Sequence, residues 1–206
     1  MNWNQYVLLV IDVQNDFTND IENPIEKMDY EKRLTRLMTD CRNRNIEIIY
    51  IRGKYKKDKS DWLNFLQYNN HPVLVEGTTG FEHEKYVNEL NNEKVIYKQT
   101  LDAFINTELN SYLKSKDKKF LFITGFSTSV CVHLTMMHGI QLGYWTCMVK
   151  DCCWDEETHQ NNIISMYKNM IINIKNHDEL FKEENYQIWN KMIEGNAVRP
   201  GLKMNE

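Results

Sequence analysis

Three residues whose side chains can take part in covalent chemistry each follow a distinctive stretch of sequence. Asp12 comes directly after the apolar run Tyr6–Ile11, and Lys98 comes directly after the apolar run Val95–Tyr97. Cys131 follows a glycine-containing turn. A carboxylate can accept a proton, an ammonium group can balance negative charge, and a thiolate can attack a carbon atom. Together, these residue types point to nucleophilic catalysis by a cysteine.

Each of the three residues also has an ordinary explanation. Asp12 could form a cap or a salt bridge at a strand end, which is also how Asp16 is best explained. Lys98 could be an exposed lysine, the commonest fate of that residue type. Cys131 could be a small buried hydrophobe, and its position alone favours that explanation. Only the combination of all three favours an active site.

The segment Gly125–Cys131 predicts a turn from a strand into a helix. Unpaired N–H groups at a helix N-terminus carry partial positive charge, which favours a thiolate over a thiol. The same groups can bind the oxyanion that forms when a carbonyl carbon is attacked. Both effects would assist an attack by Cys131.

Apolar runs alternate with helical spacing along most of the chain. Strands are predicted at 6–11, 46–51, 94–97, 120–124, 145–149 and 170–174. Helices are predicted at 30–41, 62–66, 81–90, 107–113, from 129 onward, and within 156–169 and 177–192. Such repeats predict an α/β fold with a mostly parallel sheet of about six strands and helices on both faces. Functional groups in these sheets gather at the carboxyl ends of strands, so the three chemical residues can meet at one edge.

The segment 52–79 has weak periodicity and is expected to be a long excursion that builds part of a pocket. Within it, Gly77–Gly80 lacks the lysine and the spacing of a phosphate-binding loop, so a turn at the pocket rim is expected. Trp62 and Tyr55 are expected to pack in a core or a lid rather than bind a ligand.

Size and composition favour one domain over residues 1–206. The net charge of −4 comes from 29 acidic and 25 basic residues that are mixed along the chain, so no nucleic-acid partner is expected. The longest apolar run near the N-terminus is too short for a membrane span or a signal peptide. Five irregularly spaced cysteines without a secretion signal indicate reduced thiols and a cytoplasmic location.

Three blocks of the sequence resemble the isochorismatase-like cysteine hydrolases, the group that includes nicotinamidases and N-carbamoylsarcosine amidohydrolases. The resemblance extends from about Tyr6 to Ile174, and three blocks in this order and spacing are a specific signal. The blocks are Val7–Phe17; Val95–Lys98 with Asp102–Phe104 and Thr107; and Gly125–Val132 with Thr135, Gly143–Tyr144 and Asp151.

The resemblance implies a Rossmann-like, isochorismatase-type fold in which Asp12, Lys98 and Cys131 are the catalytic residues. Asp12 would take the proton from Cys131, the thiolate would attack an amide-type carbonyl, and water would hydrolyse the thioester. Lys98 would lower the pKa of the thiol and stabilise negative charge. The backbone N–H groups of Ser127 and Cys131 would form the oxyanion hole.

The resemblance also implies a cis peptide bond between Phe126 and Ser127. Phe17 and Phe126 are expected to contact a small-molecule substrate. Relatives of this kind form assemblies, so a homo-oligomer, either a dimer or a tetramer, is expected.

Two departures from the family pattern narrow the expected chemistry. Nicotinamidases hold a metal with an Asp-x-His pair and a further histidine after the second strand, whereas Ile51–Tyr55 offers none of these ligands. We therefore expect neither a metal nor another cofactor, and nicotinamide becomes a less favoured substrate. The presence of Cys131 favours amide chemistry over vinyl ether cleavage.

The favoured hypothesis is a metal-independent cysteine amidohydrolase that acts on a small carboxamide, carbamoyl or ureido compound. One alternative is a catalytically idle family member that binds a small molecule or serves as an assembly subunit. Another is a thiol-redox protein, in which Cys152 or Cys153 would have to pair with Cys131. His133 and His138 follow Cys131 at a spacing that makes a poor zinc set, so ordinary helix-face roles are expected.

Overall fold

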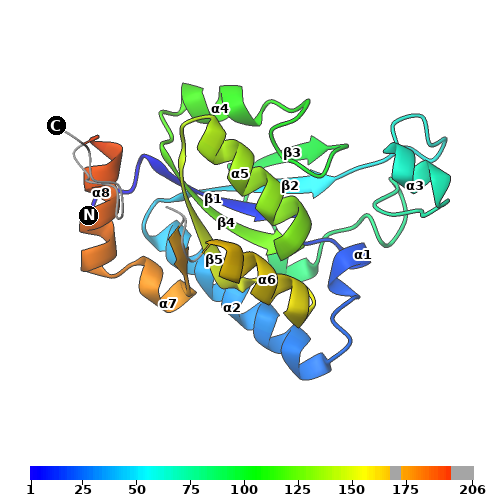
Figure 1. The fold of residues 1–206 in the computed structure, drawn as a ribbon, viewed down its shortest axis with the longest axis horizontal. Coiled ribbons are helices and arrows are strands. Elements are labelled where there is room, and N and C mark those ends of the chain that lie inside the picture. The colour runs from blue at the N-terminus through cyan, green and yellow to red at the C-terminus, as the bar shows by residue number, and fades with distance from the viewer. Residues whose placement is uncertain (168–172, 196–206) are drawn as a thin grey trace.

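The computed structural model describes residues 1–167 and 173–195, and its strands form one parallel sheet in the order β3-β2-β1-β4-β5-β6 (Figure 1). The strands are β1 (Tyr6–Ile11), β2 (Glu47–Gly53), β3 (Lys94–Lys98), β4 (Phe120–Phe126), β5 (Trp145–Trp154) and β6 (Asn173–Lys175). The predicted parallel α/β architecture with about six strands is confirmed.

The helices of the described residues lie between and after these strands. They are α1 (Asn15–Thr18), α2 (Pro24–Asn43), α3 (Asn64–Tyr68), α4 (Leu109–Ser115), α5 (His133–Gln141), α6 (Glu157–Tyr167), α7 (His177–Leu180) and α8 (Glu183–Ile193), with a 3₁₀ turn η1 (Lys85–Val87) and a π-helical turn η2 (Thr128–Val132). None of these helices is both long and apolar enough to cross a membrane.

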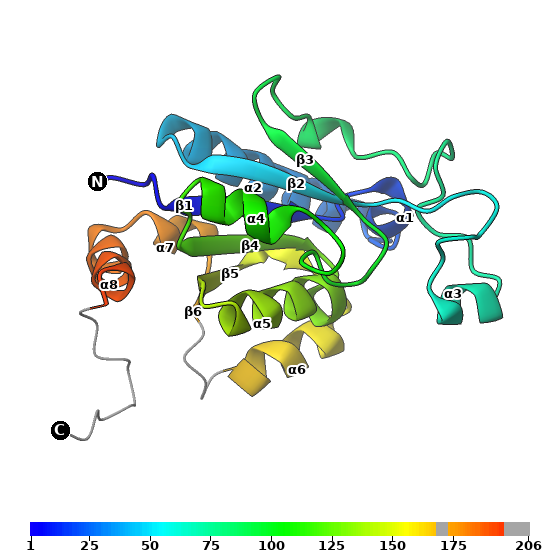
Figure 2. The same cartoon turned by 90° about the horizontal axis from the view of Figure 1, so that it is seen from above.

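The continuous apolar sequence of β1 follows from burial on both faces of the sheet. Its even-numbered residues pack in a core with Leu34 and Leu37 of α2. Its odd-numbered residues pack in a second core with Leu113 of α4 and Met136 of α5. Helices therefore cover both faces (Figure 2), and no position of β1 faces water.

Two predicted helices are wrong in part. The stretch 81–90 contains only the short turn η1, because it runs beside the chain that leaves β1: His83 bridges Gln14, and the Glu84 N–H donates to Val13 O (3.3 Å). The helix predicted within 177–192 is two helices, α7 and α8. Phe181 lies at the break, where its ring packs edge-on against Trp3. The predicted positions 168–172 lie outside the described residues.

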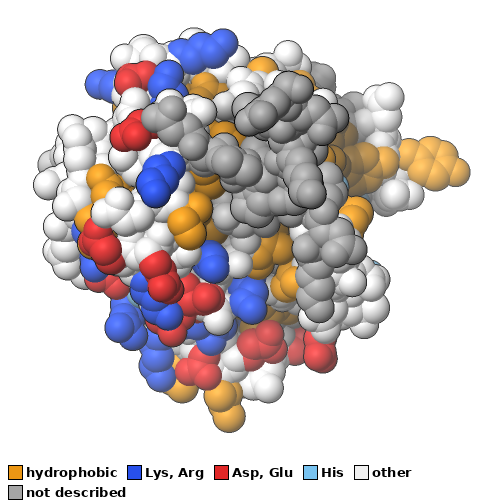
Figure 3. All heavy atoms as spheres, turned by 60° about the vertical axis from the view of Figure 1, so that its left-hand side comes forward, with side chains coloured by type: hydrophobic (Ala, Val, Ile, Leu, Met, Phe, Trp, Pro, Cys, Tyr) orange, Lys and Arg blue, Asp and Glu red, His pale blue; other side chains and the backbone are white. Residues whose placement is uncertain are grey.

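The expected excursion leaves the sheet after β2 and carries α3, which stands beyond the carboxyl ends of β2 and β3 (Figures 1 and 2). It has an apolar cluster of its own, made by Tyr55, Trp62, Leu66, Leu74 and Val75. On the side of the molecule nearest α8, acidic and basic side chains are interspersed over the described residues (Figure 3). The excursion and the carboxyl edge of the sheet lie together at the end of the molecule opposite α8 (Figure 1).

Candidate active site

The structure brings together the three side chains singled out by the sequence. Lys98 Nζ lies 2.7 Å from Asp12 Oδ2 and 3.5 Å from Cys131 Sγ. Parallel pairing of β1 with β2 and β4, and of β2 with β3, aligns the strand ends that carry these residues. The exposed fractions are 0% for Asp12, 2% for Lys98 and 5% for Cys131. An acid, an ammonium group and a thiol therefore share one buried space.

Asp12 is held by the backbone at the end of β1. Its φ of 52° lies in the left-handed region, which aspartate tolerates better than most residues. The Asp12 N–H donates to Ile51 O (2.8 Å), and Asp12 Oδ1 accepts from the Gly53 N–H (3.0 Å). Gln14 fixes the same glycine, because its amide accepts from the Gly53 N–H (2.8 Å) and donates to Gly53 O (3.0 Å). The carboxylate is thus fixed between β1 and β2.

Gly53 is a functional position that the sequence analysis missed. A Cβ atom there would lie 2.1 Å from Leu74 Cδ1, so a larger residue would push Leu74 away from its place beside Asp12. The position of Gly53 at the carboxyl end of a strand was a usable signal, since the same rule identified Asp12 and Lys98.

Lys98 uses its three N–H donors within the site. They are directed at Asp12, at Cys131 and at Thr100 O (2.9 Å). Burial lowers the pKa of Lys98, but the negative charge of Asp12 raises it more, so the pKa lies above its ordinary value. Lys98 therefore stays charged at neutral pH and compensates the buried carboxylate.

Cys131 lies in η2, the π-helical turn that leads into α5. Burial and the charge of Asp12 raise the pKa of Cys131 to about 12, whereas Lys98 acts to lower it. Lys98 therefore acts in the expected direction, but burial and the carboxylate outweigh its effect on the thiol pKa. At neutral pH the resting group is a thiol next to a carboxylate that can accept its proton.

The turn before Cys131 contains the cis peptide bond expected between Phe126 and Ser127. Three amides of this turn donate within the protein: Ser129 N–H to Asp155 (2.7 Å), and Val130 and Val132 N–H to Ser127 O (3.1 and 3.2 Å). The two amides expected to bind an oxyanion, those of Ser127 and Cys131, are not among these three.

A cavity of about 180 Å³ opens onto Cys131. Asp12 and Lys98 lie in its wall, as does Phe17, the first of the two expected substrate contacts. The other lining side chains are mostly apolar and include Tyr55, Phe65, Leu66, Val73, Leu74 and Leu101. Most of these come from the excursion, which the sequence analysis described least well. Tyr55 lines the cavity, whereas Trp62 packs in the core of the excursion and donates to Lys56 O (2.8 Å).

Phe126 does not line this cavity, and the expectation that it contacts the substrate is corrected. Its side chain is fully buried against Tyr30 of α2, with ring centroids 5.1 Å apart, and against Trp154, 5.6 Å away. It therefore belongs to the core on the other face of the sheet. The two histidines of α5 also lie outside the cavity lining: His133 bonds Tyr167, and His138 bonds Asp102 (2.6 Å).

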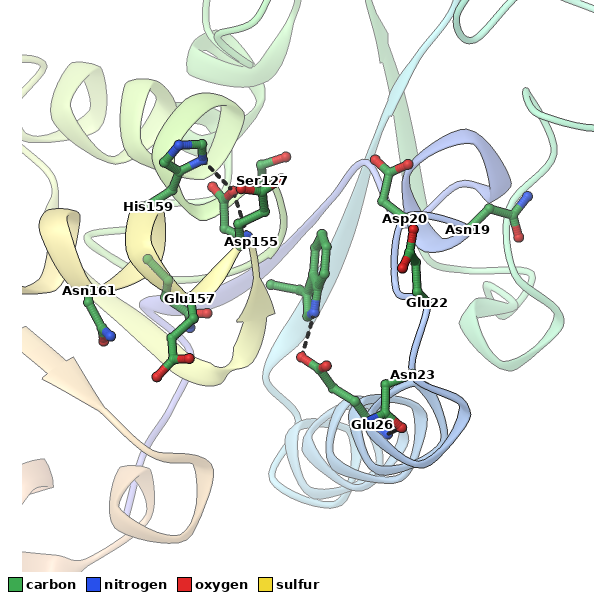
Figure 4. Close-up of a pocket in the computed structure, with 13 residues that line it drawn as sticks. Asn19, Asp20, Glu22, Asn23, Glu26, Ser127, Asp155, Glu157, His159 and Asn161 are labelled. Carbon is green, nitrogen blue, oxygen red and sulfur yellow. Dashed lines mark hydrogen bonds and ion pairs between the residues drawn. The ribbon is translucent and has the colours of Figure 1, made fainter.

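A second, larger cleft of about 840 Å³ lies beside the turn before Cys131 (Figure 4). Its lining is strongly acidic, with Asp20, Glu22, Glu26, Asp155 and Glu157, and Asp155 also bonds Ser129. Ser127 reaches its wall, but the lining includes none of the three clustered side chains. We therefore place the candidate active site in the smaller cavity, where the reactive groups are.

The fold and the site define a class of protein: a parallel α/β sheet with a buried acid, lysine and cysteine at its carboxyl edge. Residues 6–178 match the family model of the isochorismatase domain. The chain therefore belongs to the isochorismatase family of hydrolases.

Individual relatives are distant. A probable inactive nicotinamidase of Arabidopsis thaliana is 28% identical over 177 residues, which cover 80% of this chain and 89% of the relative. The ureidoacrylate amidohydrolase RutB of Acinetobacter baylyi is 23% identical over 187 residues, covering 79% and 76%. The crystal structure of an N-carbamoylsarcosine amidase from Thermoplasma acidophilum aligns over 86% of this chain and 99% of that protein, with a TM-score of 0.74 and 17% identity. At that identity the likeness shows the fold.

Proposed function

We propose that the protein is a metal-independent cysteine amidohydrolase that cleaves the C–N bond of a small carboxamide, carbamoyl or ureido compound. The observation that carries this proposal is the position of Lys98 Nζ, in contact with both the carboxylate of Asp12 and the sulfur of Cys131. A buried cation between a proton acceptor and a nucleophile can stabilise the negative charge as it moves between them during acyl transfer.

In the first half of the reaction, the Cys131 thiol attacks the carbonyl carbon. Its proton moves to Asp12 while the S–C bond forms, so no free thiolate accumulates. This concerted transfer suits a thiol whose pKa is about 12. The negative charge that leaves Asp12 appears on the carbonyl oxygen, where the backbone N–H groups of Ser127 and Cys131 would bind it.

In the second half, the tetrahedral species collapses. The C–N bond breaks, and the leaving nitrogen takes the proton from Asp12, which leaves an acyl thioester on Cys131. Asp12 then removes a proton from water, the hydroxyl attacks the thioester carbon, and the S–C bond breaks. The sulfur recovers its proton, and the acid product leaves.

The names of the relatives support the reaction class, because a ureidoacrylate amidohydrolase and an N-carbamoylsarcosine amidase both act on C–N bonds. Metal independence is proposed from the residues, since the segment that would supply an Asp-x-His pair reads Ile51–Tyr55. Within the described residues, no group of three His, Cys, Asp or Glu side chains is arranged to hold a metal ion.

A screen for ammonia release from small amides and ureido compounds tests the proposal, with Cys131→Ala as the inactive control. We expect turnover that the Cys131→Ala variant loses and that a chelator leaves unchanged. Ammonia release that survives the substitution would refute Cys131 as nucleophile. Binding of a small molecule without any turnover by the intact protein would instead support the idle, ligand-binding alternative.

A further inference from the structure

We propose that the cavity selects neutral carboxamides with a branched aliphatic or aryl acyl group and rejects substrates whose acyl side carries a carboxylate. This inference rests on the proposed function and names the substrate class of the same site. It excludes those ureido acids whose carboxylate stays on the acyl side when ammonia leaves, which the proposed function alone would admit.

The wall around the acyl side of the cavity is apolar. Phe17 of α1 faces it from one element, and Phe65 and Leu66 of α3 face it from another. Leu74 and Leu101 complete the wall close to Asp12 and Lys98. A substrate group in contact with these side chains gains free energy in proportion to the apolar area that it buries.

Apart from the exposed His71, the polar side chains in the wall direct their hydrogen-bond donors at groups of the protein. Lys98 directs its three N–H groups at Asp12, Cys131 and Thr100. The Tyr55 hydroxyl donates to Gln99 O (3.2 Å).

The remaining polar side chains of the wall lead to the same conclusion. The Thr100 hydroxyl donates to Asp102 O (2.7 Å). His71 is exposed at the rim, where an ion pair would contribute little. A carboxylate that enters the cavity would therefore lose its water without gaining a buried partner among these side chains, and it would lie near the negative charge of Asp12.

The volume of the cavity also fits a compact apolar group. A cavity of about 150 Å³ lined by aliphatic and aromatic side chains is large enough to hold benzene. The cavity of about 180 Å³ next to Cys131 therefore accommodates an aryl ring or a branched chain of similar size.

A matched pair of substrates tests the inference. 4-Methylpentanamide ends in an isopropyl group, and succinamate has a carboxylate of the same shape in its place. We expect kcat/KM for ammonia release to be at least about 30-fold higher for 4-methylpentanamide, because a buried charged group would be left unpaired. Equal rates, or a preference for succinamate, would overturn the inference while leaving the proposed amidohydrolase intact.

Two substitutions in α3 distinguish an effect of the cavity wall from an effect of the neighbouring surface. Phe65 lines the cavity and is 49% exposed, so Phe65→Arg adds a cation to the wall without opening a core. We expect the ratio of kcat/KM for 4-methylpentanamide to kcat/KM for succinamate to fall at least tenfold in this variant, because it gains activity on succinamate and loses activity on the apolar amide. Tyr68 lies on the same helix, is 91% exposed and does not line the cavity. Tyr68→Arg should leave the ratio within twofold, and an equal shift in both variants would contradict a role for the wall.

A binding experiment keeps this inference separate from the proposed function. Calorimetry with the Cys131→Ala variant measures affinity for each compound without any reaction. Tighter binding of 4-methylpentanamide supports the selective cavity even if the intact protein turns over neither compound, in which case only the proposed function fails. Failure of the variant to bind 4-methylpentanamide more tightly than succinamate would overturn the inference, whatever the activity of the intact enzyme.

Discussion

Replacing Asp12 with asparagine should make Cys131 more reactive toward alkylation while it removes catalysis. The carboxylate raises the pKa of the thiol, second only to burial among the causes. Asparagine has nearly the same shape but carries no charge and cannot take up the proton. The same substitution therefore acts in opposite directions on chemical labelling and on turnover.

The size of the effect follows from the geometry. Because Lys98 Nζ contacts Asp12 Oδ2 at 2.7 Å and Cys131 Sγ at 3.5 Å, the sulfur lies within about 6 Å of that oxygen. At an effective dielectric constant of about 20, a unit charge at this distance shifts the thiol pKa by roughly 2 units. The thiolate fraction then rises about 100-fold. Because a less basic thiolate is also a weaker nucleophile, the alkylation rate should rise about tenfold.

The assay follows carbamidomethylation of the Cys131 peptide by mass spectrometry at pH 8, in the intact protein and in the Asp12→Asn variant. Cys147 is fully buried in β5, and its labelling in the same samples reports any loss of folding. Amide hydrolysis by the variant should fall by about 10² to 10⁴, the usual contribution of a general acid–base group. Slower or unchanged labelling of Cys131 in the variant would refute the charge balance described for the site.

Three further outcomes are expected. The rate of alkylation of Cys131 in the intact protein should rise about tenfold per pH unit from pH 7 to 9, because the thiolate fraction of a thiol with a pKa of about 12 rises by that factor in this range. A plateau in the rate below pH 9 would contradict that pKa. Lys98→Met should lower the free energy of unfolding by roughly 3–5 kcal/mol in urea titrations, since Asp12 would be left buried without its partner, and unchanged stability would show that the carboxylate is not charged. Gly125→Ala should lower the free energy of unfolding by at least about 2 kcal/mol, because φ is +118° and the added Cβ would lie 1.9 Å from Ile11 O. Gly143 has a φ of +92° with open space around it, so Gly143→Ala should lower the free energy of unfolding distinctly less. Equal losses in the two variants would refute the steric argument.

The sheet and the reactive cluster were predictable because local patterns determine them. A strand buried on both faces needs an unbroken apolar run, and β1 has one. Polar residues that end such runs lie at the carboxyl edge of a parallel sheet, and this rule identifies Asp12 and Lys98 from the sequence. Cys131 needed more than its position, and the resemblance to a family supplied it.

Other features depend on contacts between distant parts of the chain. The stretch 81–90 was predicted to be a helix, but hydrogen bonds to the segment after β1 hold it in another conformation. The wall residue Leu74 is fixed by a bond from its N–H to Asp16 Oδ2 (2.6 Å), 58 positions away. No local sequence pattern indicates either contact, so the cavity wall could not be predicted from the sequence.

The location of Phe126 could have been inferred from the alternation of side chains along β4. Phe120 and Phe122 share its parity and lie in the same core as Tyr30 of α2. Cys131, which leads into α5, belongs to the core on the opposite face. The predicted strand ended at residue 124, whereas β4 continues to Phe126, so the period of two extends to this residue.

Trapping the acyl enzyme tests the central claim most directly. The intact protein would be mixed with 4-methylpentanamide, quenched in acid within the first turnovers, and digested for peptide mass analysis. A thiol nucleophile predicts that the Cys131 peptide gains the mass of the acyl group, and that the gain disappears on treatment with hydroxylamine. Steady hydrolysis of the amide with an unmodified Cys131 peptide at every quench time, and equal hydrolysis by Cys131→Ala, would contradict the account.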